Sequence, residues 1–120
     1  MDLDFFKKVN DRYGHEAGDT VLIHLAKTIK TQVRATDYVI RWGGEEFLVL
    51  MPGCPVEQAV CIAEIIRAKI QESNNGVCSI MVSIGVAEYT GGDYHQLIKD
   101  ADEAMYKAKS NGRNRVVKAG

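Results

Sequence analysis

Two glycines followed by two glutamates lie between two short apolar runs, and no other feature limits the fold as strongly. Tyr38–Ile40 precedes this segment and Phe47–Met51 follows it; both runs are rich in β-branched or aromatic residues, which favours strands. A Gly43-Gly44 pair between strands predicts a two-residue hairpin, because primed turns require positive φ. We therefore expect a tight hairpin over about residues 37–51, with two carboxylates beside a turn of little side-chain bulk.

Length and charge narrow the class of protein. The chain has 120 residues, 46% of them hydrophobic and 26% charged, which fits one compact domain. Its net charge of −1 argues against a nucleic-acid polymer or an anionic membrane surface as the main partner, although a small nucleotide needs only a few cations. No apolar run approaches the roughly 18 residues of a membrane span. Three cysteines without CxxC spacing fit reduced thiols and a cytoplasmic protein.

Periodicity divides the rest of the chain into alternating helices and strands. Helices are expected over residues 5–13, from residue 18 to about 33, and over 56–71 and 94–109, because apolar residues recur there at helical spacing. Besides the hairpin, strands are expected at the first few residues, over 78–86 and over 115–117. This order predicts an α+β fold with a ferredoxin-like, palm-type antiparallel sheet and helices packed around it.

A second group of chemically informative residues surrounds the first junction of strand and helix. Asp2 and Asp4 flank this junction. With Glu45 and Glu46 opposite them, they would form the oxygen-rich cluster that Mg²⁺ requires. The first amides of the following helix would favour a phosphate. For Asp4, a helix cap or another structural role is the alternative.

Spaced motifs along almost the whole chain resemble one family. The N-terminal motif comprises Asp2-Leu3-Asp4-Phe5-Phe6-Lys7, Asn10-Asp11, Gly14-His15 and Gly18-Asp19. The hairpin motif is Gly43-Gly44-Glu45-Glu46-Phe47, and the C-terminal motif comprises residues 101–106 and 109–114. In this order they resemble the GGDEF domain of diguanylate cyclases, in its GGEEF form.

The resemblance implies a metal and triphosphate site. Asp2, Glu45 and the Leu3 carbonyl would hold Mg²⁺ or Mn²⁺, and Glu46 would complete the coordination or assist deprotonation of the attacking 3′-hydroxyl. The triphosphate would be contacted by the amides of Phe5 and Phe6 and by the side chains of Lys7, Lys109 and Arg113.

It also implies how the base is recognised and how product is sensed. Asn10 and Asp19 would hydrogen-bond the guanine edge, while Gly43 and Gly44 would leave room for the nucleotide. Arg34 and Asp37 resemble the family's inhibitory site for cyclic di-GMP. Some members add an arginine near the position of Ile65, which cannot serve that purpose here.

The function implied is condensation of two GTP into cyclic di-GMP and two pyrophosphates between two such domains, so a homodimer is expected. One alternative is a catalytically silent module that binds GTP or cyclic di-GMP, although the presence of Asp2, Glu45 and Glu46 favours the enzyme. Another palm-like nucleotidyl transferase or cyclase is weaker, because Asn10 and Asp19 suit guanine. Compared with the family pattern, the sequence predicts a domain without its N-terminal helix and most of its first strand, and so less stable than a whole domain.

Overall fold

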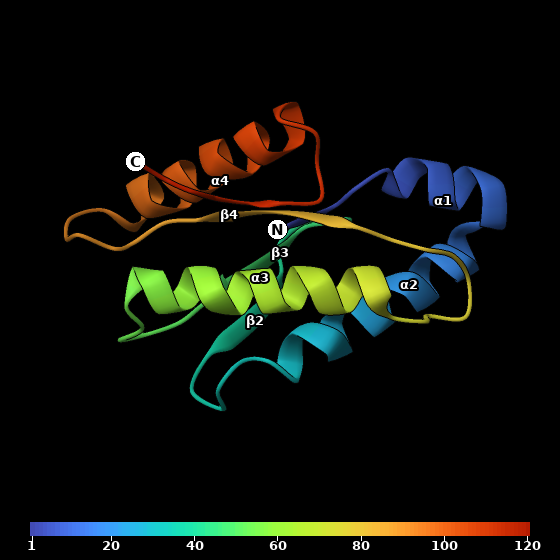
Figure 1. The fold of residues 1–120 in the computed structure, drawn as a ribbon, viewed down its shortest axis with the longest axis horizontal. Coiled ribbons are helices and arrows are strands. Elements are labelled where there is room, and N and C mark those ends of the chain that lie inside the picture. Colours follow the sequence, from blue (N-terminus) through green and yellow to red (C-terminus); the bar gives the residue numbers. More distant parts are fainter.

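The computed structural model describes residues 1–120 as four helices and five strands (Figure 1). In chain order these are β1 (Asp2–Leu3), α1 (Phe6–Tyr13), α2 (His15–Lys30), β2 (Tyr38–Arg41), β3 (Phe47–Leu50), α3 (Val56–Glu72), β4 (Val82–Val86), α4 (Tyr94–Ser110) and β5 (Val116–Lys118). The α+β class predicted from the sequence is confirmed. None of the four helices combines the length and the apolar character needed to cross a membrane.

The strands form two small sheets that meet at β1. One sheet has the order β1-β4-β5, with β1 antiparallel and β5 parallel to β4, and β2 pairs with β3 in the other. A bridge between Asp2 and Glu46 joins them. Beside this bridge, the amide of Phe47 donates to the Met1 carbonyl at 2.8 Å and the amide of Leu3 donates to the Glu45 carbonyl at 3.3 Å. The start of β3 therefore lies directly beside β1.

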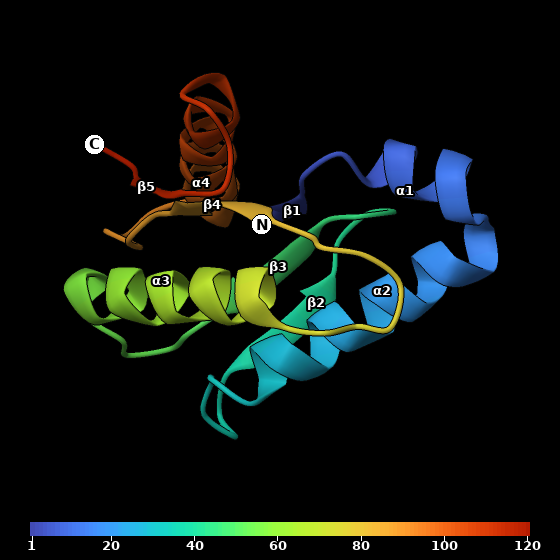
Figure 2. The ribbon, with the colours of Figure 1, turned by 45° about the vertical axis from the view of Figure 1, so that its right-hand side comes forward.

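Helices α3 and α4 lie on opposite sides of β4 in both views (Figures 1 and 2). Alternate residues of a strand point to opposite faces, and the sequence of β4 follows that rule. Val82 and Ile84 belong to the main buried cluster with residues of α2 and α3. Gly85 instead approaches the backbone of α4. The strand thus separates an aliphatic core from a close contact between a helix and the sheet.

Helix α2 begins three residues earlier than the sequence predicted. The chain turns at Gly14, where φ is 90°, and the amide of Gly18 already donates to the Gly14 carbonyl at 3.1 Å. Gly18 lies inside the helix rather than before it. A Cβ at Gly18 would lie 1.9 Å from Oδ1 of Asn10, so this glycine lets the Asn10 side chain of α1 lie against α2.

The predicted two-residue Gly-Gly turn of the hairpin is wrong. Arg41 pairs with Phe47, so residues 42–46 form a five-residue loop, and neither Gly43 nor Gly44 has positive φ. The loop is closed by the Glu46 carbonyl, which accepts from the amides of Trp42 at 2.9 Å and Gly43 at 3.4 Å. The Arg41 guanidinium also donates to the Gly44 carbonyl, at 2.7 Å from Nη2. These contacts replace a primed turn.

The predicted strand over residues 78–86 is shorter than expected, since β4 begins only at Val82. The Asn75 side chain accepts from the amides of Val77 and Cys78 at 2.8 and 3.0 Å and donates to the Cys78 carbonyl at 2.8 Å. A side chain that satisfies backbone groups in this way competes with sheet pairing. The asparagine turn therefore extends into the segment whose apolar residues had favoured a strand.

Candidate functional site

Two carboxylates meet where the hairpin loop lies beside β1. The Asp2 side chain is 14% exposed, and its Oδ1 atom is buried without a hydrogen-bond partner. Burial raises the pKa of Asp2, although Lys109 opposes this shift. Burial also raises the pKa of Glu45, and the negative charge of Asp2 raises it further. Lys109 thus compensates the ionised form of both carboxylates only in part, and a bound cation would supply the rest.

Glu46 lies in a different electrostatic setting. Burial lowers the pKa of the Met1 amino group, and Glu46 is the first of the negative charges that oppose this shift. A Cβ at Gly43 would lie 3.4 Å from Oε2 of Glu46, so this carboxylate packs back over the loop. No group of three or more acidic, histidine or cysteine side chains converges as a metal site. Of the predicted metal set, Asp2 and Glu45 are electrostatically coupled, and the Leu3 amide contacts the Glu45 carbonyl.

Three cationic side chains lie at or near the start of α1. The first amides of a helix have no partner within it, and Phe5, which precedes the helix with φ 59°, provides no side-chain cap for them. The Arg113 guanidinium lies over the Phe5 ring, 4.6 Å from its centroid. Lys109 lies 3.5 Å from Asp2 Oδ2, and Lys7 is exposed in the first turn. This end of the helix has the amides and charges that bind a polyphosphate.

Asn10 is a polar residue of α1 that faces α2. Its Oδ1 atom is buried and has no hydrogen-bond partner, while it lies against Gly18. Asp19 follows that glycine and is exposed on α2. An amide and a carboxylate side chain therefore lie on two helices that pack together.

Sequence reasoning overlooked the partners of Asp4. The absence of a side-chain cap on α1 excludes the cap, and the structural alternative holds: Asp4 accepts from Ser83 Oγ at 2.7 Å and from the Asn114 amide at 3.0 Å. In the sequence, Ser83 is the one hydroxyl residue within the otherwise apolar or small residues of β4. A hydroxyl at such a position needs a polar partner when it is buried, and this could have indicated the contact with Asp4.

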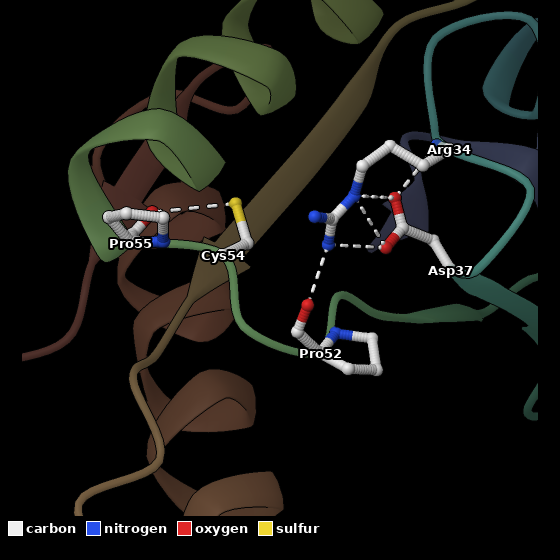
Figure 3. A network of polar contacts seen from close by, with 5 residues as sticks. All are labelled: Arg34, Asp37, Pro52, Cys54 and Pro55. Atoms are coloured by element: carbon white, nitrogen blue, oxygen red, sulfur yellow. Dashed lines mark hydrogen bonds and ion pairs between the residues drawn. The ribbon is translucent and has the colours of Figure 1, made fainter.

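Arg34 and Asp37 form an ion pair just before β2, the first strand of the hairpin (Figure 3). Nη2 of Arg34 donates to Asp37 Oδ1 at 2.8 Å and to the Pro52 carbonyl at 2.7 Å. Nε of Arg34 also donates to both carboxylate oxygens, at 3.1 and 3.2 Å. Hydrogen bonding from Arg34 lowers the pKa of Asp37. A ligand at this guanidinium must share it with two existing acceptors.

A cleft of about 1070 Å³ lies between the hairpin, α3 and α4, and Met1 and Glu46 reach its edge. Its lining is mostly aliphatic and aromatic and includes none of Lys7, Lys109 or Arg113. The size of this cleft therefore does not make it the expected polyphosphate site, because such a site requires cations and free amides.

Comparison with known proteins shows which family the chain belongs to. Residues 1–115 match the model of the family described as "Diguanylate cyclase, GGDEF domain". Diguanylate cyclase DgcM of Escherichia coli K12 is 46% identical over 121 residues, which cover 99% of this chain but 30% of that protein. The active GGEEF domain of a diguanylate cyclase from Vibrio cholerae superposes with a TM-score of 0.92 at 36% identity, covering 99% of this chain and 79% of that one.

The GGDEF domain of DgcB from Caulobacter crescentus, solved in complex with c-di-GMP, has a TM-score of 0.89 at 34% identity; 98% of this chain and 73% of that one are covered. The chain belongs to the GGDEF family of diguanylate cyclase domains. It spans about 30% of the length of the curated relative DgcM.

Proposed function

We propose that this chain is the catalytic domain of a cytoplasmic diguanylate cyclase, which converts two GTP molecules into cyclic di-GMP and two pyrophosphates. Family membership supports this reaction. The observation that carries the proposal is the pair formed by Asp2 and Glu45, whose pKa values are raised by burial. One oxygen of the pair has no partner, and Lys109, one of the cations expected to contact the triphosphate, lies 3.5 Å from Asp2 Oδ2.

The acid pair fits a hard divalent cation, Mg²⁺ or Mn²⁺. Asp2, Glu45 and the Leu3 carbonyl would hold it, and carboxylate and carbonyl oxygens are the ligands that it prefers. When bound, the ion would polarise the α-phosphate and neutralise charge on the departing pyrophosphate. Glu46 would complete the coordination or accept the proton of the 3′-hydroxyl.

The other residues of the site would orient the nucleotide. The Phe5 and Phe6 amides, Lys7, Lys109 and Arg113 would contact the triphosphate, which favours in-line attack through positioning and electrostatics. Asn10 and Asp19 would pair with the guanine edge, whose acceptor and donors match an amide and a carboxylate.

Gly43 and Gly44 would serve the ligand rather than the turn. Neither has positive φ, and a Cβ at Gly44 would meet nothing within 4 Å. Nothing within the domain therefore demands a glycine at residue 44, and close approach of a nucleotide would explain it.

Two domains are needed for the complete reaction. One such site would hold one GTP, and each 3′-hydroxyl must attack the α-phosphate of the other nucleotide. We therefore propose an antiparallel homodimer whose two sites face one another. Product formation per chain should rise with protein concentration, because the active species is the dimer.

Incubation with GTP and Mg²⁺ tests the proposed activity directly. We expect cyclic di-GMP and pyrophosphate in a ratio of one to two, measured by chromatography, and a rate about 100-fold or more lower for Glu46→Ala if this carboxylate removes the proton. Glu72→Ala, an exposed acid at the end of α3, is the matched control. GTP or cyclic di-GMP binding without product at high protein concentration would instead support the silent regulatory module.

We further propose that Arg34 and Asp37 bind cyclic di-GMP as an inhibitory product site. Arginine suits this task because its planar fork pairs with phosphate and stacks on guanine. Arg34→Lys keeps the charge but loses the fork, so we expect product affinity, measured by calorimetry, to fall about tenfold. Arg67→Lys on α3, which changes another ion-paired arginine, should leave that affinity unaltered. Equal affinities for Arg34→Lys and the unchanged protein would exclude this site.

A further inference from the structure

Asp4 is the only acidic residue that is buried as a whole residue. Its side chain is 1% exposed, and it accepts three hydrogen bonds from three different segments. Ser83 Oγ and Lys109 Nζ donate to Oδ1 at 2.7 and 3.1 Å, and the Asn114 amide donates to Oδ2 at 3.0 Å. One side chain of the segment between β1 and α1 thus joins β4, the last turn of α4 and the loop before β5.

The loop that Asp4 holds has an uncommon backbone. Arg113 and Asn114 have φ values of 63° and 46°, a left-handed conformation that costs free energy for residues other than glycine. Three contacts stabilise it: the Asn114 amide with Asp4, the Asn114 side chain with Arg67 Nη1 at 3.1 Å, and the Arg113 amide with the Ala108 carbonyl at 2.9 Å. In this conformation the Arg113 guanidinium lies over the Phe5 ring.

The ammonium group of Lys109 lies within ion-pair distance of two carboxylates. Its Nζ atom lies 3.1 Å from Asp4 Oδ1 and 3.5 Å from Asp2 Oδ2. The shorter contact is with the more deeply buried acid, where an ion pair is less screened by water. Asp4 therefore takes the closer contact with Lys109, and Asp2, the acid with a free oxygen, has only the longer one.

We propose that Asp4 is a positioning residue for polyphosphate binding: it touches no ligand itself, but fixes Lys109 and the Arg113 loop at the start of α1. This inference rests on the proposed function, since it concerns the triphosphate of the same site. Without the Asp4 charge, Lys109 moves from Asp4 into a closer contact with Asp2, and the left-handed loop loses the charged acceptor of its Asn114 amide. Both changes weaken contacts to the β- and γ-phosphates and leave the guanine side of the site intact.

The test compares GTP with GMP, which lacks those two phosphates. For Asp4→Asn, which keeps the shape and removes the charge, calorimetry in Mg²⁺ should show GTP affinity reduced about tenfold, because a hydrogen bond to a charged group is lost, and GMP affinity within about twofold of wild type. Ser83→Ala removes another partner of the same carboxylate and should lower the melting temperature without changing the ratio of GTP to GMP affinity. In a Lys109→Gln background, Asp4→Asn should cost less GTP affinity than in the wild type, because the part of its effect that acts through Lys109 is already lost and only the part through the Arg113 loop remains.

Equal losses for GTP and GMP, or a lower melting temperature with unchanged GTP affinity, would show that Asp4 is only structural. If Asp4→Asn does not fold, Asp4→Glu provides the same comparison, because the longer side chain keeps the charge but displaces its partners. Failure of the wild-type chain to bind GTP at all would contradict the proposed function instead.

Discussion

Asp2→Asn is expected to lower the rate of cyclic di-GMP synthesis severely while leaving the domain at least as stable as wild type in the absence of a divalent cation. The folded-state pKa of Asp2 is raised by burial, so its ionised form costs stability at neutral pH, and this cost disappears below the unfolded pKa. Asparagine removes that cost together with the repulsion from Glu45. It also removes the charge that would hold the metal, and a loss of roughly 10²- to 10⁴-fold in rate follows from transition-state stabilisation of several kcal/mol.

Two measurements separate these effects. Thermal unfolding without divalent cation gives the stability, and product formation at saturating GTP and Mg²⁺ gives the rate. Asp11→Asn, which neutralises an exposed acid of α1, controls for the change in net charge and should alter neither. A rate within tenfold of wild type would remove Asp2 from the metal site. A large drop in stability would mean that the ion pair with Lys109 at 3.5 Å outweighs the desolvation of Asp2.

The local patterns of the sequence were sufficient to predict most elements. All four helices were expected from apolar residues at helical spacing, and the strands from short β-branched runs. The sequence predictions were wrong where a single polar group bonds to nearby backbone amides and changes the local structure. The Glu46 carbonyl closes a five-residue loop where Gly-Gly predicted two residues, and Asn75 prevents strand pairing at Cys78. Such contacts depend on the orientation of single groups, which periodicity does not encode.

In the candidate site too, local sequence motifs predicted some features and long-range contacts decided the others. The sequence motifs indicated Asp2 and Glu45, and the bridge between Asp2 and Glu46 accounts for their proximity. The contacts of Asp4 with Ser83 and Asn114 span 79 and 110 positions of the chain, and no local pattern predicts them. The overlap of Asn10 with the space beside Gly18 likewise arises from the packing of two helices. Long-range packing thus decides which of the many polar residues become buried partners.

Gly85→Ala should destabilise the domain by about 3 kcal/mol, with a melting temperature roughly 10 °C lower. A Cβ at this position of β4 would lie 2.0 Å from the Ala101 carbonyl oxygen and 2.4 Å from the Met105 amide nitrogen. Both atoms belong to the backbone of α4, so no rotamer change can relieve the overlap and the whole helix must move away from the sheet.

Because α4 also carries Lys109, this displacement should weaken GTP binding in whatever fraction remains folded. Urea unfolding measures the stability, and calorimetry with GTP measures the effect on the site. Gly44→Ala is the matched control for stability, since its φ is not positive and its new Cβ would meet no atom within 4 Å; we expect a change within about 0.5 kcal/mol. Equal stability of Gly85→Ala and Gly44→Ala would contradict this prediction. It would mean that the close packing of α4 on β4 does not fix the position of Lys109 relative to Asp2 and Asp4.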